Sequence, residues 1–221
     1  MRIALLGGTG DIGQGLALRW AYDTGHEILI GSRKAEKAET KASEYETKLA
    51  GRDVDASIDG YENPEAAARA DVVVLSVPAY HLSDTIGAVA DELRDAILVS
   101  PAIGMQRDEG GIHYNPPSAG SVTELAASAA PDDVPVIGAF HSLAAGRLAN
   151  LDADLDWDVP VVGDDADAKE TVCGLADDIE GVRPLDAGPL ANAAEVETLT
   201  PLLINLAANN ERLHDLGVKF Q

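Results

Sequence analysis

The chain has 221 residues, 46% of them hydrophobic, which is ample for one large domain or for a nucleotide-binding domain with a small companion. Asp and Glu total 38 against 16 Lys and Arg, and the formal net charge of −22 makes nucleic acid and anionic membranes poor partners. Since the sequence has neither a long apolar run nor a signal sequence, we expect a soluble cytoplasmic protein. The single cysteine, Cys173, excludes an internal disulfide.

The acidic residues are spread along the chain rather than gathered in a tail. Self-repulsion at this charge destabilises a compact chain in dilute buffer and is tolerated where salt screens it. We therefore expect a halophilic protein from a salt-rich cytoplasm. The densest acidic cluster, residues 152–158, is interpreted as a solvated loop rather than as a metal site.

The first element is an apolar run of strand type, residues 2–6, followed at once by a glycine cluster and a helical pattern. The glycines fit G-x-G-x-x-G as Gly8, Gly10 and Gly13. In this motif the first glycine makes a tight turn, the second lets backbone approach a pyrophosphate, and the third lets the helix pack close to the strand. The helix start adds free N–H groups and a positive dipole end. The sequence therefore predicts a dinucleotide site rather than a ligand-free turn.

The second predicted strand, residues 27–32, decides which dinucleotide is bound. NAD sites usually place Asp or Glu at the end of this strand, where the carboxylate accepts hydrogen bonds from ribose hydroxyls. Here the strand ends in Ser32 and Arg33, and Lys37 follows one helical turn later. A hydroxyl and cations suit a 2′-phosphate, which Arg can grip through a forked pair. We predict NADP; the competing interpretation is a solvated helix start in which neighbouring glutamates pair with these cations.

The remaining elements alternate between helix and strand, which predicts an α/β fold with a Rossmann-type, doubly wound, mostly parallel sheet. We expect helices over residues 35–50, 62–69, 120–130 and 166–180, and strands over residues 54–57, 71–77, 96–100, 134–140, 159–163 and 182–186. Residues 106–119, rich in Gly, Pro and Asn, are expected to form a loop. A final apolar helix around Leu199 should bend at Pro201 or restart there with Thr200 as its cap.

Loops at the carboxyl ends of parallel strands line the ligand crevice, so Val77 and His81 should lie near the cofactor. His81 fits a simple helix start equally well.

A dehydrogenase acting on an alcohol or an imine needs a proton donor or acceptor beside the hydride acceptor. The second half of the chain offers few candidates: Lys169, Lys219, His141 and His214. No Tyr-x-x-x-Lys spacing, Ser/His/Asp set or metal-ligand cluster is evident. The pattern suits hydride exchange between two bound cofactors, in which orientation does most of the work.

Six segments together resemble the archaeal NADPH:coenzyme F420 oxidoreductases: MRIALLGGTGDIGQGLALR, EILIGSRKAEKAE, HSLAAGRLANL, DWDVPVVGDDADAK, GVRPLDAGPL and LGVKF. The combination of GDD with RPLDAGPL is not a general Rossmann feature. The resemblance implies an NADP-binding Rossmann domain over residues 1–148 and a small C-terminal α/β extension over residues 149–221. A deazaflavin then lies in the cleft between them, stacked against the nicotinamide for direct hydride transfer.

The resemblance also implies residue roles. Thr9, Gly10, Asp11 and Ile12 would hold the pyrophosphate, and Ser32, Arg33 and Lys37 the 2′-phosphate. Val77, His81 and Ile103 would line the nucleotide, while His141, Leu143, Ala145 and Leu216 would lie near the nicotinamide or the deazaflavin. His141 is then a positioning group rather than an obligatory acid. Gly104, where the family pattern has Pro, and residues 209–214 depart from that pattern.

Two other functions stay open at this point. One is an NADP-dependent reductase of a small carbonyl or imine substrate, related to the pyrroline-carboxylate reductase group, which normally adds a long helical dimerisation domain. The other is a non-catalytic NADP-sensing module. We expect only small-molecule cofactors as ligands, and a homo-oligomer, taken as a dimer.

Overall fold

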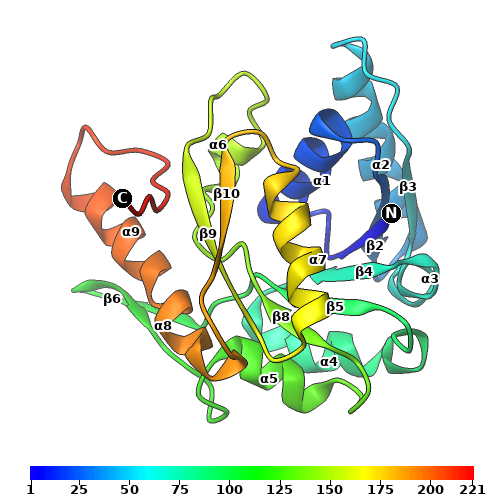
Figure 1. Cartoon of the computed structure of the whole chain (residues 1–221). Helices are drawn as coiled ribbons and strands as arrows, with labels where there is room; N and C mark the ends of the chain where they lie inside the picture. The colour runs from blue at the N-terminus through cyan, green and yellow to red at the C-terminus, as the bar shows by residue number, and fades with distance from the viewer.

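The computed structural model describes residues 1–221 and is built around an eight-stranded, mostly parallel sheet (Figure 1). The strand order is β10-β9-β8-β5-β4-β1-β2-β3. The strands of this sheet are β1 (Arg2–Leu6), β2 (Glu27–Ser32), β3 (Ile58–Glu62), β4 (Val72–Leu75), β5 (Ile97–Ser100), β8 (Val136–Gly138), β9 (Trp157–Gly163) and β10 (Val182–Asp186). The predicted doubly wound α/β fold is confirmed.

Helices cover both faces of the sheet, because alternate residues of each buried strand face opposite sides. Ile3 and Leu5 of β1 belong to one buried cluster, and Ala4 and Leu6 belong to the other. The first cluster lies under α1 (Asp11–Asp23), α2 (Ala35–Ala50), α6 (Ala145–Leu148) and α7 (Ala166–Asp177). The second lies under α3 (Asn63–Arg69), α4 (Leu82–Gly87) and α5 (Val122–Ala129). Short 3-10 helices η1 (Ala79–His81), η2 (Ala90–Glu92) and η3 (Leu190–Asn192) complete the connections.

Several elements begin and end at the predicted residues, among them β2, α2 and β10. The third strand was predicted wrongly, because residues 54–57 precede β3, which begins at Ile58. β3 contains Gly60, where a Cβ atom would overlap the backbone of Ala38 and Glu39 in α2. Close approach of α2 therefore selects this segment as the strand, although glycine has low strand propensity.

Residues 106–119 were expected to form a loop, but part of them forms a separate antiparallel hairpin, β6 (Met105–Asp108) and β7 (Gly111–Tyr114). The side chains of β6 are all exposed, so no alternating apolar pattern marks the hairpin in the sequence. The hairpin is bound to α9 (Leu199–Asn209) by two hydrogen bonds. The Asn205 side-chain amide accepts from the N–H of Ile112 (3.0 Å) and donates to the carbonyl of Ile112 (2.6 Å). At Gly104 a Cβ would overlap the carbonyl oxygen of Asn115, so proline does not fit there.

The chain reverses direction at β9. β8 is parallel to β5, whereas β9 pairs antiparallel with β8 through Ile137–Gly163 and Gly138–Val162, and β10 then runs parallel to β9. The first residues of β9 therefore extend past the carboxyl end of β8. The sheet is continuous across residue 148, and the division into two domains at that point stays a prediction.

The predicted break near Pro201 is present, but at a different residue. α8 (Ala193–Glu197) ends at Thr198 and α9 begins at Leu199, so Thr200 lies inside a helix instead of capping it. Pro201 has no N–H to donate to the carbonyl of Glu197, four residues earlier, which explains the interruption. No helix of the chain is both long and apolar enough to cross a membrane.

Candidate active site

The loop between β1 and α1 has glycine at positions where a side chain does not fit. Gly7 has φ +77°, and a Cβ there would lie 2.7 Å from the carbonyl oxygen of Ser76, so the tight turn is made one residue before the predicted Gly8. Gly13 packs on Gly8, with a Cβ position 2.6 Å from its Cα. At Gly10, by contrast, the nearest atom to a Cβ would be the Gly7 oxygen at 3.6 Å. The loop therefore leaves space for a ligand beside Gly10.

Helix α1 starts without a side-chain cap. Its first intrahelical hydrogen bond runs from the N–H of Gln14 to the carbonyl of Gly10 (2.8 Å). The N–H groups of Asp11, Ile12 and Gly13 consequently have no partner within the helix, and the positive end of the helix dipole lies at Gly10. A helix start of this kind suits a phosphate group.

The end of β2 lies next to this loop, because the N–H of Gly7 donates to the carbonyl of Gly31 (3.0 Å). Ser32 is buried at the end of the strand, while Arg33 and Lys37 are exposed. Neither cation forms an ion pair, so the predicted competing pairs with neighbouring glutamates are not formed. Two free cations and a hydroxyl beside the glycine loop can bind a second phosphate group.

Four buried side-chain atoms lack a hydrogen-bond partner: Asn63 Oδ1, Ser76 Oγ, Ser100 Oγ and His141 Nδ1. Asn63 directly follows β3, Ser76 follows β4, Ser100 ends β5, and His141 comes three residues after β8. All four therefore lie on the carboxyl side of parallel strands, where doubly wound sheets bind ligands. Buried polar groups are normally paired, so this line of unpaired atoms fits a polar ligand that completes the hydrogen bonds.

The chain reaches His141 through a strained residue. Phe140 has φ +66°, a conformation that costs an aromatic residue about 1–3 kcal/mol. Its buried ring meets Trp20 of α1 edge-on, with ring centroids 5.5 Å apart at 84°, which offsets the strain. His141 is 4% exposed, and burial lowers its pKa to about 4, so the imidazole is neutral at pH 7.

A buried carboxylate lies near this histidine. Glu197, at the end of α8, is fully buried and accepts hydrogen bonds from four donors. They are the N–H groups of Val122 (3.0 Å) and Thr123 (2.9 Å), the Thr123 hydroxyl (3.0 Å) and the Tyr114 hydroxyl (3.0 Å). Burial raises the pKa of Glu197, and these hydrogen bonds oppose the rise. The Thr123 hydroxyl also lies 3.4 Å from Nε2 of His141.

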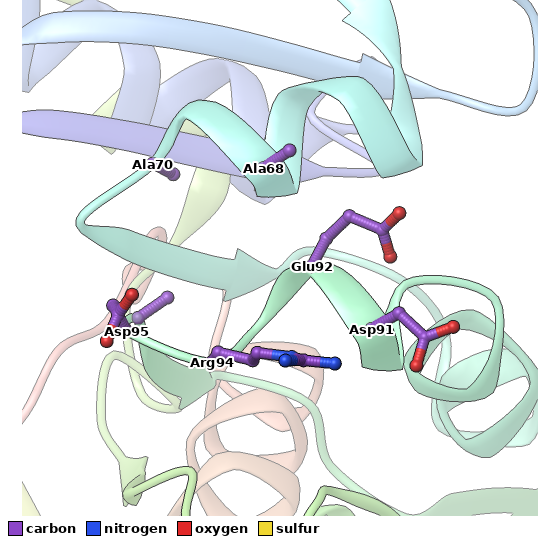
Figure 2. A pocket seen from close by; sticks show the side chains of 7 residues that line it. Ala68, Ala70, Asp91, Glu92, Arg94 and Asp95 are labelled. Carbon is purple, nitrogen blue, oxygen red and sulfur yellow. The ribbon is translucent and has the colours of Figure 1, made fainter.

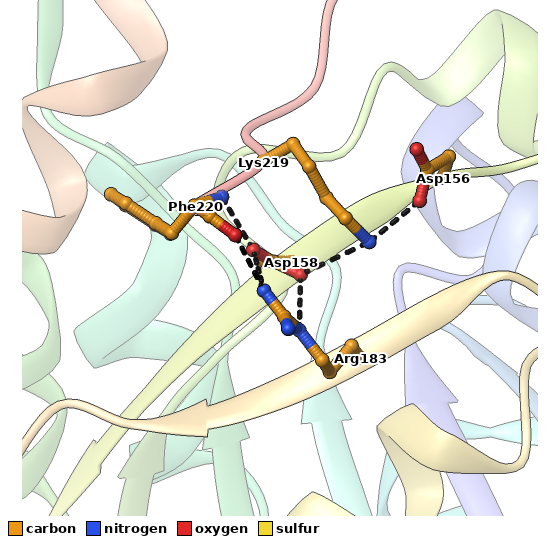
Figure 3. A network of polar contacts seen from close by, with 5 residues as sticks. All are labelled: Asp156, Asp158, Arg183, Lys219 and Phe220. Atoms are coloured by element: carbon orange, nitrogen blue, oxygen red, sulfur yellow. Dashed lines mark hydrogen bonds and ion pairs between the residues drawn. The ribbon is translucent and has the colours of Figure 1, made fainter.

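The C-terminal segment is fixed along the start of β9 by a polar network around Asp158 (Figure 3). Arg183 donates from Nε and Nη2 to the two Asp158 oxygens (2.8 and 2.7 Å), and the N–H of Phe220 donates to Oδ2 (2.6 Å). The bond from Arg183 is the main reason that the pKa of Asp158 falls to about 2. Lys219 pairs with Asp156 (2.6 Å). The predicted solvated loop is therefore wrong for Asp158, which is fully buried in β9.

This segment returns from α9 toward the sheet (Figure 1). A contact between Asp215 and Gly146 places it beside α6. The Asp215 carboxylate is 3.6 Å from the position of a Cβ on Gly146, and Gly217 packs on the Trp157 indole. Leu216, between these two contacts, is half-buried next to the helix that begins at Ala145.

The other predicted residues lie along the same side of the sheet. Val77 contacts the glycine loop, with its Cγ1 2.7 Å from a Cβ position on Gly7. Leu143 is buried and Ile103 is half-buried. His81 is exposed in η1 with its ring beside Tyr80, and no hydrogen bond joins it to the loop.

A pocket of about 310 Å³ lies elsewhere, at the ends of α3 and η2, where the chain enters β4 and β5. Figure 2 shows Asp91, Glu92 and Arg94 around it. It is therefore at the amino ends of the parallel strands and contains none of the predicted site residues.

Asn63, Thr123 and Glu197 were not predicted from the sequence, because they lie in three separate helices, α3, α5 and α8, that only the tertiary fold brings to the site. Ser76 and Ser100 could have been found, because each stands at the predicted carboxyl end of a buried strand. Arg19 was missed as well. It is buried and donates to the carbonyls of Leu148, Asn150 and Ala153 (3.0, 2.8 and 2.9 Å), which joins α1 to the segment after α6.

The glycine loop, the free helix start and the cations after β2 are the features of a Rossmann-type dinucleotide-binding protein. Residues 2–104 match the family described as NADP oxidoreductase, coenzyme F420-dependent. The chain is 42% identical to the F420-dependent NADP reductase of Methanothermobacter thermautotrophicus, over 99% of this chain and 94% of that protein. It is 41% identical to that of Methanocaldococcus jannaschii, over 93% and 92%. The chain belongs to the family of F420-dependent NADP reductases.

A solved structure from Arthrobacter sp., described as a candidate F420-dependent NADP-reductase, has the same fold. Its TM-score to this chain is 0.82 at 25% identity, and the match covers 100% of this chain and 99% of the other.

Proposed function

We propose that this protein transfers hydride directly and reversibly between reduced coenzyme F420 and NADP. The observation that carries the proposal is the open, uncapped start of α1 next to two unpaired cations, Arg33 and Lys37. The similarity over the full chain to F420-dependent NADP reductases supports the second cofactor.

The backbone from Thr9 to Gly13 binds the pyrophosphate in this proposal, because it offers free N–H groups at a helix start. Ser32, Arg33 and Lys37 bind the 2′-phosphate, which distinguishes NADP from NAD.

Three of the four candidate proton donors, His141, Lys169 and Lys219, are poorly suited to a carbonyl or imine reduction. His141 is neutral at pH 7, with a pKa of about 4. Lys169 donates to Asp186 (2.9 Å) and to the carbonyl of Gly188 (3.0 Å), and Lys219 pairs with Asp156. Coenzyme F420 supplies, when bound, a carbon-centred hydride donor, so the protein has to orient two rings and exclude water rather than deliver a proton.

Residues 149–221 cover the deazaflavin in this proposal, and residues 1–148 bind NADP. Support comes from the reversal at β9, which carries the start of that strand and the segment from Leu216 to Phe220 past the end of β8.

The proposal includes a homodimer, because α9 exposes Leu202 and Leu206, which lie one helical turn apart (55% and 40% exposed). The molar mass from light scattering in solution tests whether the protein is a dimer. The charge of −22 supports operation at high salt.

The experiment that tests the activity mixes the purified protein anaerobically with reduced deazaflavin and either NADP or NAD. We expect reduction of NADP, with deuterium passing from the labelled deazaflavin to the nicotinamide. A panel of small carbonyl and imine substrates with NADPH is the matched control. Turnover on that panel alone would identify a small-molecule reductase, and NADP binding without turnover of any acceptor would identify a sensing module.

A further inference from the structure

The buried carboxylate of Glu197 is surrounded entirely by groups that can donate hydrogen bonds. Two are backbone N–H groups, which cannot accept. The other two are the hydroxyls of Thr123 and Tyr114, at 3.0 Å each. Such a set stabilises a carboxylate, which only accepts, so both hydroxyl protons point to Glu197.

Because the Thr123 hydroxyl donates to Glu197, its proton is not free for its other neighbour, His141. A hydroxyl has one proton, and that proton is directed to Oε1 of Glu197. The Thr123 oxygen can then only accept from Nε2 of His141, 3.4 Å away. Because the imidazole is neutral, a proton on Nε2 leaves Nδ1 as a bare acceptor. Nδ1 is buried and has no partner in the protein.

We propose that Glu197, acting through Thr123, is a positioning residue that fixes His141 as the Nε2–H tautomer, so that Nδ1 accepts a hydrogen bond from an N–H group of a bound cofactor. The backbone of His141 is also fixed, since the Thr200 hydroxyl donates to its carbonyl (2.9 Å). The inference rests on the proposed function for the identity of the cofactors. Both carry an N–H donor, the nicotinamide carboxamide in one case and the pyrimidine ring of the deazaflavin in the other.

The tautomer is measured without any cofactor, by nitrogen-15 NMR of histidine-labelled protein at neutral pH. The signals of His141 are identified by their loss in His141→Gln. We expect wild-type His141 to carry its proton on Nε2. A proton on Nδ1, or an even mixture of the two forms, overturns the proposal before any further variant is needed.

The relay is tested by removing one hydroxyl at a time. Thr123→Val keeps the shape of the side chain but removes the acceptor, and we expect a mixture of tautomers. Thr123→Ser restores the hydroxyl and should restore the single tautomer. Tyr114→Phe is the matched control, because it removes a donor from the other oxygen of the same carboxylate and should leave the tautomer unchanged. An unchanged tautomer in Thr123→Val refutes the relay.

Binding measurements then decide which cofactor supplies the N–H group. NADP and the deazaflavin are titrated separately into wild type, Thr123→Val and Thr123→Ser. We expect one dissociation constant to rise about 2- to 10-fold in Thr123→Val, as for loss of one neutral hydrogen bond, and to recover in Thr123→Ser. If that cofactor is NADP, the acetylpyridine analogue, which lacks the amide N–H, should bind wild type more weakly than NADP and show no further loss in Thr123→Val.

Equal binding of both cofactors to wild type and Thr123→Val refutes the proposal even when the enzyme turns over. Failure of the wild type to reduce NADP with reduced deazaflavin refutes instead the proposed function. The tautomer measurement is independent of that result.

Discussion

Replacing Arg33 by alanine should weaken NADPH binding by about 1.5–3 kcal/mol, the range for a hydrogen bond to a charged group. Arg33 is exposed and forms no ion pair, so the substitution removes no contact within the free protein, and the melting temperature should change little at molar KCl, where charge repulsion is screened. Since 1.4 kcal/mol corresponds to a factor of ten, the dissociation constant should rise roughly 10- to 150-fold. NADH has no 2′-phosphate, and its binding should change little.

The assay is fluorescence titration of NADPH and NADH at one fixed ionic strength, because the loss of any cation from an acidic chain also weakens long-range attraction to anions. Arg94→Ala is the matched control. Arg94 is likewise exposed and forms no ion pair, but it lies at the pocket by the amino ends of the parallel strands, away from the candidate site (Figure 2). Equal losses for NADPH and NADH, or an equal loss in Arg94→Ala, would show that Arg33 does not contact the 2′-phosphate.

Three further outcomes are expected. The melting temperature should rise strongly from low to molar KCl as repulsion among −22 charges is screened, and a flat or falling curve removes the halophilic interpretation. His141→Asn should lower turnover by up to about 100-fold through misplacement, without gain or loss of a pH-rate limb near pH 6–7, because His141 is already neutral. Asp158 has a folded-state pKa of about 2, below its unfolded value, so its stabilisation is present above about pH 4 and is lost as the pH falls toward 2. Chemical denaturation at several pH values should show a flatter acid profile for Asp158→Asn than for the exposed control Asp154→Asn.

The elements that could be predicted from the sequence are those whose own pattern determines them. The β-branched run of β4 and the glycines before α1 specify a buried strand and a phosphate loop almost alone. β3 and the β6–β7 hairpin could not be predicted this way. Gly60 lies in a strand because α2 packs on it, and Ile112 is held by a side chain from α9. Both depend on partners distant in sequence.

The residues of the candidate site likewise include some that the local sequence predicts and others that it does not. The predicted 2′-phosphate cluster at Arg33 depends on neighbours in sequence, and the structure leaves its cations free. The environment of His141 could not be foreseen, because Glu197 and Thr123 are brought to it by helices that no local spacing connects. Asp158 was misjudged for a related reason: its partner Arg183 lies on the next strand, and an alternating acidic run gives no sign that one member is buried.

Arg19 has a consequence for how the protein can move. Its buried guanidinium binds three carbonyls at and after the end of α6, so a hinge at residue 148 would leave a charged group buried without partners. Gly15 adds to this rigidity, since a Cβ there would lie 2.8 Å from Leu148. The helix that starts at the phosphate loop and the segment that follows α6 must therefore move as one body. Strand β6 and residues 210–215, by contrast, are exposed, and residues 210–215 lie outside any helix or strand, so this rigid coupling does not extend to them.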